Sequence, residues 1–176
     1  MTVPFLNPGA QFKALRSETL AAVERVLESG HYILGPNVAA LEQEMASAAG
    51  SRFGVGVNSG SDALTLALRA LEIGPGDEVI TSPFTYIAPA ESIHQVGARI
   101  LFADIDPRTF CMDLADVRRK ISPQTRAIIP IHLFGQAAPL NGLLDLAGER
   151  RIRIIEDCAQ AIGALAGGRP VGGIGD

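Results

Sequence analysis

From residue 53 onward, short apolar runs alternate with stretches of helical periodicity, and this alternation constrains the fold more than any other feature. The apolar runs are four or five residues long, and turn sequences such as Gly74-Pro75-Gly76-Asp77 separate them from their neighbours. Strands that alternate with crossover helices form a parallel sheet covered by helices on both faces. The sequence therefore predicts an α/β fold with a mostly parallel sheet. The expected strands are 53–57, 78–81, 99–103, 127–131 and 152–155, and the expected helices between them are 61–71, 87–96, 114–121 and 140–150.

Two amphipathic helices are expected before this region. The first is predicted over 16–28, with Gly30 as the residue that ends it. The second is predicted over 38–49, with Asn37 as its N-cap and Gly50 after its last turn.

Composition argues against several classes of function. The 176 residues are 47% hydrophobic and 19% charged with a net charge of −4, which is typical of a globular domain. No basic patch with interleaved aromatic residues is present, so nucleic-acid binding is not expected. The apolar runs are too short to span a membrane and the N-terminus does not resemble a signal peptide, so a cytoplasmic protein is expected. Cys111 and Cys158 are expected to be free thiols, and the three scattered histidines do not predict a metal site.

The segment Asn58-Ser59-Gly60-Ser61-Asp62 is the first candidate binding element. It follows a predicted strand and begins a helix, whose first amides lack intrahelical acceptors and carry the positive end of the helix dipole. Gly60 would allow close approach of a ligand and Ser61 could add a hydroxyl, so the segment predicts a phosphate site. The alternative is that Ser61 or Asp62 only caps the helix.

Asp157 is the second candidate. It follows the apolar run 152–155, where an unpaired carboxylate is costly to bury, and a protonated pyridine nitrogen would supply both a charge and a hydrogen bond. Gln160 could donate to the phenolic oxygen of the same ring. Together they indicate pyridoxal phosphate (PLP), whose protonated ring acts as an electron sink. The alternative is that Asp157 caps a following helix while Gln160 faces solvent.

Other residues near strand ends have less specific signals. Tyr86 could stack on a cofactor ring, with Phe84 as its rival, and core packing is the alternative for either. His132 is expected to be satisfied by backbone groups or to support the site from behind. Cys158 is expected to pack rather than to act as a nucleophile.

Eight motifs extend these observations over the whole chain. They are His31-Tyr32-Ile33-Leu34-Gly35-Pro36, Asn58-Ser59-Gly60-Ser61-Asp62-Ala63-Leu64, Gly76-Asp77-Glu78-Val79-Ile80, Pro83-Phe84-Thr85-Tyr86, Asp104-Ile105-Asp106-Pro107, His132-Leu133-Phe134-Gly135-Gln136, Glu156-Asp157-Cys158-Ala159-Gln160-Ala161 and 172–176. In this order and at this spacing, the chain resembles the DegT/StrS family of PLP-dependent nucleotide-sugar aminotransferases.

The resemblance implies a fold type I enzyme that moves an amino group, usually from glutamate, to a nucleotide-linked keto-sugar. It implies a homodimer and a role in cell-surface polysaccharide or amino-sugar biosynthesis. The cofactor residues that it implies are Gly60, Ser61 and Asp62 at the phosphate, Tyr86 on the ring face, Asp157 at the pyridinium and Gln160 at the ring oxygen.

The family's Schiff-base lysine has no counterpart at Lys13 or Lys120, the two lysines of the sequence. The resemblance places it beyond Asp176, so no catalytic residue is assigned and the chain alone is expected to be inactive. Residues 1–176 are expected to form the N-terminal part of the PLP-binding large domain, without its remaining strands, its lysine segment or the C-terminal small domain. Because those strands would lie between 152–155 and 53–57, the former is expected to have a bare edge and the latter to lack a partner. The alternatives are a sugar dehydratase of the same family, with histidine in place of lysine, and a truncated product without catalysis.

Overall fold

The computed structural model describes residues 4–176, which divide into two units, 4–41 and 42–176. The first unit contains α1 (Pro8–Ser29), whose N-cap Asn7 accepts a hydrogen bond from the amide of Ala10 and whose C-cap Gly30 has a φ of 68°. Helix α2 (Pro36–Ala49) begins in this unit and continues into the second. Both helices start earlier than the sequence predicted, because proline fits the first turn of a helix. Asn37 therefore lies inside α2, and its prediction as the N-cap is wrong.

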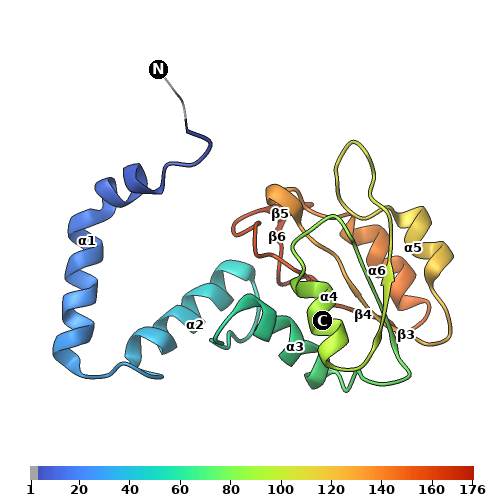
Figure 1. The fold of residues 1–176 in the computed structure, drawn as a ribbon, viewed down its shortest axis with the longest axis horizontal. Coiled ribbons are helices and arrows are strands. Elements are labelled where there is room, and N and C mark those ends of the chain that lie inside the picture. The colour runs from blue at the N-terminus through green and yellow to red at the C-terminus, as the bar shows by residue number, and fades with distance from the viewer. Residues whose placement is uncertain (1–3) are drawn as a thin grey trace. The chain divides into compact units, whose positions relative to one another are not determined.

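A four-stranded parallel sheet forms the centre of the second unit (Figure 1). Its strand order is β2-β1-β3-β4, so the chain adds strands on both sides of β1. This arrangement confirms the predicted α/β class with a parallel sheet. The strands are β1 (Glu78–Thr81), β2 (Arg99–Phe102), β3 (Thr125–Ile129) and β4 (Arg153–Ile154).

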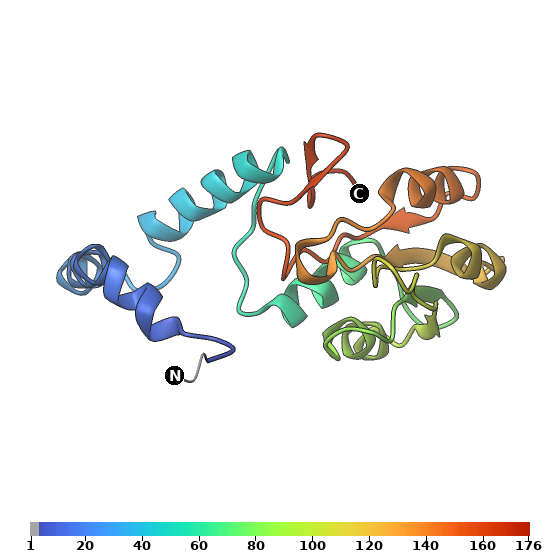
Figure 2. The ribbon, with the colours of Figure 1, turned by 90° about the horizontal axis from the view of Figure 1, so that it is seen from above.

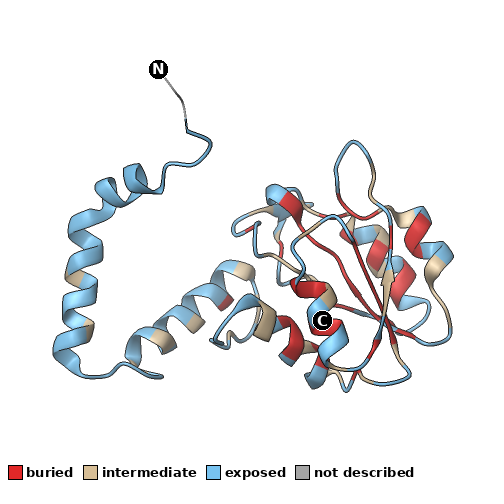
Figure 3. Ribbon diagram, viewed as in Figure 1, coloured by how far each residue is buried: buried red, intermediate tan, exposed pale blue. Residues whose placement is uncertain are grey.

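Helices cover both faces of this sheet, as predicted (Figure 2). Successive strand residues point to opposite faces: Ile128 packs with α5 and α6, whereas Ala127 and Ile129 pack with α3 and α4. The two resulting cores contain most of the buried residues (Figure 3). The helices are α3 (Gly60–Ala70), α4 (Ala88–Gln95), α5 (Leu114–Lys120) and α6 (Leu140–Gly148).

The strand predicted over 53–57 is absent from the structure. Phe53 and Val55 are 75% and 80% exposed, and the segment has no strand neighbour. It is held instead by α2, because the amide of Gly56 donates to Oε1 of Glu42 at 2.7 Å. A strand without a neighbour leaves its backbone unpaired, and alternating glycines weaken it further, so the prediction fails here.

A short hairpin that the sequence analysis did not predict follows the sheet. It joins β5 (Leu165–Ala166) to β6 (Arg169–Pro170) through Gly167 and Gly168. Both glycines have positive φ, 57° and 82°, which is the conformation of a two-residue hairpin turn.

The last residues of the sequence return to β4. The amide of Asp176 donates to the carbonyl of Ile154 and the amide of Ile154 donates to the Asp176 carboxylate, both at 2.9 Å. Arg153 also forms an ion pair with this carboxylate. The edge of β4 is therefore covered at this point, and the expectation of a bare edge is wrong. No helix within residues 4–176 combines the length and the apolarity that crossing a membrane requires.

Candidate functional site

A cavity of about 190 Å³ lies at the carboxyl edge of the sheet, where ligands bind in folds of this class. The N-terminus of α3, the loop after β1 and the segment after β4 contribute its walls. Five of the six residues predicted from the sequence line it, and Asp62 does not. The lining residues are Gly60, Ser61, Leu64, Thr85, Tyr86, Ala88, Pro89, Ile131, Asp157, Ala159 and Gln160.

The N-terminus of α3 presents free backbone donors to this cavity. Ser59 is the N-cap: its hydroxyl accepts from the Asp62 amide at 3.1 Å and donates to the Asp62 carboxylate at 3.0 Å. Asp62 is therefore turned toward Ser59. Helix capping was the alternative role expected for Ser61 or Asp62, and in the structure Ser59 caps the helix instead. Within the described chain, the amides of Gly60 and Ser61 have no acceptor. With the helix dipole, they form an anion site that neither side chain of the cap occupies.

Asp157 is fixed by its backbone and leaves part of its carboxylate free. Its amide donates to the carbonyl of Pro130 at 2.9 Å and its carbonyl accepts from the amide of His132 at 3.0 Å, which extends the β3–β4 pairing beyond the strands. Oδ1 accepts from the amide of Ala159 at 3.0 Å, so the predicted capping contact exists, although a turn rather than a helix follows. Among residues 4–176, Oδ2 has no hydrogen-bond donor. The half-buried carboxylate can therefore accept a bond from a ligand in the cavity.

Gln160 is held by one end of its side-chain amide. Its Oε1 accepts from the backbone amide of Phe134 at 3.1 Å, which leaves the NH₂ group as the end that can donate to a ligand. Phe134 lies in the 3-10 turn η1 (Leu133–Gly135) with a φ of 56°, a left-handed conformation that costs a non-glycine residue on the order of 1 kcal/mol. The backbone amide of this strained residue fixes the direction of the Gln160 side-chain amide.

The two aromatic candidates after β1 line one hollow together, but only Tyr86 also lines the cavity that contains Asp157. Tyr86 lines the cavity that contains Asp157 and is 73% exposed. Phe84 stacks with Phe110, with ring centroids 5.8 Å apart, and lines an adjoining hollow of about 410 Å³ together with Phe134. Tyr86 thus shares a cavity with Asp157, whereas Phe84 does not line it, and the stacking of either ring on a cofactor stays a prediction.

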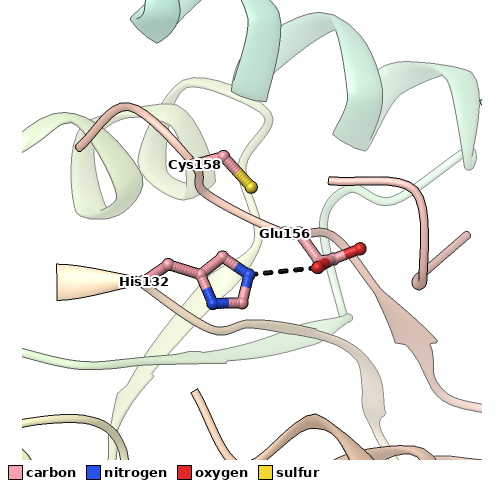
Figure 4. A group of neighbouring side chains, drawn as sticks. All are labelled: His132, Glu156 and Cys158. Carbon is pink, nitrogen blue, oxygen red and sulfur yellow. Dashed lines mark hydrogen bonds and ion pairs between the residues drawn. The ribbon is translucent and has the colours of Figure 1, made fainter. Parts of the chain in front are cut away.

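Glu156 is the residue at this edge that the sequence analysis did not single out (Figure 4). Its side chain is 3% exposed, and Oε2 accepts from His132 Nε2 at 3.0 Å. Three backbone amides, from Gly172, Ile174 and Gly175, also donate to it. Burial alone would raise the pKa of Glu156, but the hydrogen bond from His132 and those from the three amides outweigh it and lower the pKa to about 2.

His132, Glu156 and Cys158 place three possible metal ligands within 4.8 Å of one another (Figure 4). Their chemistry does not suit a metal ion. Nδ1 of His132 accepts from the amide of Ala138 at 2.9 Å while Nε2 faces Glu156, so both ring nitrogens are engaged. Burial, followed by the charges of Glu156 and Asp157, raises the pKa of the Cys158 thiol to about 12. A metal-binding cysteine must lose its proton, whereas this one is held protonated.

The DegT/DnrJ/EryC1/StrS aminotransferase family matches residues 13–176. A curated relative, UDP-N-acetyl-3-dehydro-alpha-D-glucosamine 3-aminotransferase of Acidithiobacillus ferrooxidans, is 49% identical over 99% of this chain and 47% of its own length. The dTDP-3-amino-3,4,6-trideoxy-alpha-D-glucose transaminase of Streptomyces venezuelae is 45% identical over 97% of this chain and 45% of its own length. The chain thus spans about half the length of the curated relatives it matches.

Solved structures of similar proteins superimpose on this chain. A crystal structure of S. venezuelae DesV in complex with a ketimine intermediate superimposes with a TM-score of 0.94 and 45% identity, covering 97% of this chain and 46% of that one. The PLP form of the sugar aminotransferase Spr1654 from Streptococcus pneumoniae gives a TM-score of 0.85 at 34% identity, over 89% of this chain and 44% of that one. These similarities confirm the fold type I assignment.

Proposed function

Because the chain belongs to the DegT/DnrJ/EryC1/StrS aminotransferase family, we propose that it forms the PLP-binding part of a nucleotide-sugar aminotransferase. The observation that carries the proposal is the convergence of Asp157, Gln160, Tyr86 and the N-terminus of α3 on one cavity. These residues come from three segments that are up to a hundred residues apart in the sequence.

The groups that line the cavity fit PLP in charge and in hydrogen bonding. The unpaired amides of Gly60 and Ser61 would bind the phosphate, and the unpaired Oδ2 of Asp157 would accept a hydrogen bond from the protonated ring nitrogen. The NH₂ group of Gln160 would donate to the phenolic oxygen, and Tyr86 would cover a face of the ring. When bound, PLP supplies an electron sink for chemistry at the carbon that carries the amino group.

Asp157 has the most specific task in this proposal. Its carboxylate would keep a proton on the ring nitrogen, and the backbone pairing with Pro130 and His132 keeps that carboxylate at a fixed depth. The cavity is lined by no lysine among residues 4–176. The group that moves the proton between substrate carbons is therefore not assigned to this chain, which we expect to bind PLP without a covalent bond.

The relatives support a substrate class. Their names share a nucleotide-linked sugar with its amino or oxo group at carbon 3, so we propose a nucleotide-linked 3-keto-sugar as the acceptor. Glutamate as amino donor, a homodimeric assembly and a cytoplasmic location complete the proposal. The last of these agrees with the free thiols of Cys111 and Cys158.

Titration of the purified chain with PLP tests the proposal. We expect saturable binding, followed by absorbance and fluorescence, with a free-PLP-like spectrum and no added mass after borohydride reduction. Asp157→Asn removes the charge but keeps the shape, and it should weaken binding by about 10- to 100-fold, the equivalent of one charged hydrogen bond. Asp145→Asn changes an exposed carboxylate outside the cavity and should bind like the wild type.

Each result has a distinct meaning. No PLP binding by the wild type would contradict the proposed function. Equal binding by the wild type and Asp157→Asn would remove Asp157 from the site. A covalent adduct after reduction would show that an amine of this chain reacts with the cofactor.

A further inference from the structure

Two consecutive carboxylates, Glu156 and Asp157, lie just after β4 but face different surroundings. Asp157 lines the cavity, whereas Glu156 is buried against His132 and the segment 172–175. Successive side chains along an extended segment point to opposite sides, which accounts for this division. Glu156 therefore cannot touch a ligand in the cavity directly, and its effect on the site must pass through other groups.

The carboxylate of Glu156 uses its full capacity as an acceptor. Oε2 accepts from His132 Nε2 at 3.0 Å and from the amide of Gly172 at 2.9 Å. Oε1 accepts from the amides of Ile174 at 2.8 Å and Gly175 at 2.7 Å. An ionised carboxylate has about four lone-pair positions, and four donors fill them here. One buried side chain thus fixes a glycine-rich segment to the segment that follows β4 and contains Asp157.

His132 connects this carboxylate to the cavity. Its Nδ1 accepts from the amide of Ala138, so the ring proton must lie on Nε2, where it points to Glu156. The backbone amide of the same residue donates to the carbonyl of Asp157. Two residues later, the amide of Phe134 holds Oε1 of Gln160. A single segment, 132–134, therefore joins Glu156 to the backbone of Asp157 and to the side chain of Gln160.

From this geometry we propose that Glu156 is a positioning residue for the cavity: through His132 it sets the directions of Asp157 and Gln160. This inference rests on the proposed function, because it assumes that PLP is the ligand. Loss of the Glu156 carboxylate would release the segment 172–175 and allow the His132 ring to turn. Asp157 would then no longer keep the proton on the ring nitrogen of PLP.

The variant Glu156→Gln tests this. Glutamine keeps the size of the side chain, but its NH₂ end cannot accept the hydrogen bonds that one carboxylate oxygen receives. We expect faster amide hydrogen exchange at Gly172, Ile174 and Gly175, and a PLP dissociation constant raised by about tenfold or more. The NMR shift of ¹⁵N in the ring of labelled PLP should also move toward that of the neutral ring. Glu44→Gln is the control, since Glu44 is exposed on α2 and forms no hydrogen bond or ion pair within the described residues.

The ring-nitrogen shift distinguishes positioning from simple support of the fold. A folded Glu156→Gln protein that loses amide protection but binds PLP with unchanged affinity and unchanged ¹⁵N shift would overturn the inference. If the wild type itself fails to bind PLP, the proposed function falls, and the hydrogen-exchange measurement still reports whether Glu156 holds the segment 172–175. If Glu156→Gln does not fold, Glu156→Asp keeps the charge with a shorter reach. A wild-type affinity and ¹⁵N shift in that variant, with the segment released, would likewise overturn the inference.

Discussion

The stability of the protein should depend on pH through Glu156. A carboxyl group whose pKa is lower in the folded than in the unfolded state stabilises the fold at pH values above its unfolded pKa. That contribution is lost as the pH falls through the folded value. For Glu156 the pKa falls from an ordinary 4.5 to about 2. At about 1.4 kcal/mol per pKa unit, the shift corresponds to roughly 3 kcal/mol of folding free energy at neutral pH. The side chain is only 3% exposed, so solvent screens this contribution little.

Urea unfolding at a series of pH values measures this contribution. The free energy of unfolding of the wild type should exceed that of Glu156→Gln by roughly 3 kcal/mol at pH 7. The difference should shrink as the pH falls below about 5 and approach zero near pH 2. Asp116, whose pKa is lowered chiefly by a hydrogen bond from the Asp104 amide, also makes the fold acid-sensitive. The contribution of Asp116 is present in the wild type and in Glu156→Gln, so it cancels when their free energies of unfolding are subtracted.

The pH dependence of the difference in unfolding free energy shows whether the charge of Glu156 stabilises the fold. A stability difference that stays constant between pH 7 and pH 3 would mean that the variant acts through packing and that the carboxylate charge contributes nothing. Identical stabilities at pH 7 would mean that the four hydrogen bonds to Glu156 only offset the cost of burying it.

Four further predictions concern packing and reactivity. A Cβ at Gly173 would overlap the backbone carbonyl of Ala49, so Gly173→Ala should lower the free energy of unfolding by about 1–3 kcal/mol. Gly148→Ala, in a helix with open space around the added carbon, should instead raise it by about 0.5–1 kcal/mol, and urea unfolding measures both. Leu143 is fully buried on the side of α6 that packs against the sheet, so Leu143→Ala should lower the free energy of unfolding by about 2–5 kcal/mol, seen as a lower Tm. With a thiol pKa of about 12, Cys158 should react slowly with a disulfide reagent at pH 8 and quickly once urea unfolds the chain.

The sequence predicted the sheet well where each strand has its partners and helices nearby. The range 78–81 matches β1 at both ends, and the remaining strands of the sheet differ by a few residues. The prediction for 53–57 failed because strand formation depends on a neighbour that local sequence does not reveal. The hairpin of β5 and β6 was missed although Gly167-Gly168 is a known hairpin signal, because its flanking strands are only two residues long.

The candidate site, too, was predictable from the sequence only in part. Asp157 and Gln160 were predictable because both follow an apolar run at the carboxyl edge of a parallel sheet. The position of the helix cap was off by two or three residues, since any of Ser59, Ser61 and Asp62 is a good N-cap and only the backbone angles select Ser59. Glu156 was missed because three of its four donors are backbone amides, which have no sequence signature.

A signal for Glu156 was nevertheless present in the sequence. Two adjacent carboxylates after an apolar run cannot both face a cavity, because the side chains of an extended segment alternate. One of them must therefore be buried on the opposite side, and burial requires donors. Glycine-rich backbone is a suitable source, since its amides approach closely: even a Cβ at Gly172 would come within 3.2 Å of Cys158 Sγ. The doublet Glu156-Asp157 and the glycines at 172–175 thus belong to one structural unit, in which the first carboxylate organises the backbone and leaves the second free for a ligand.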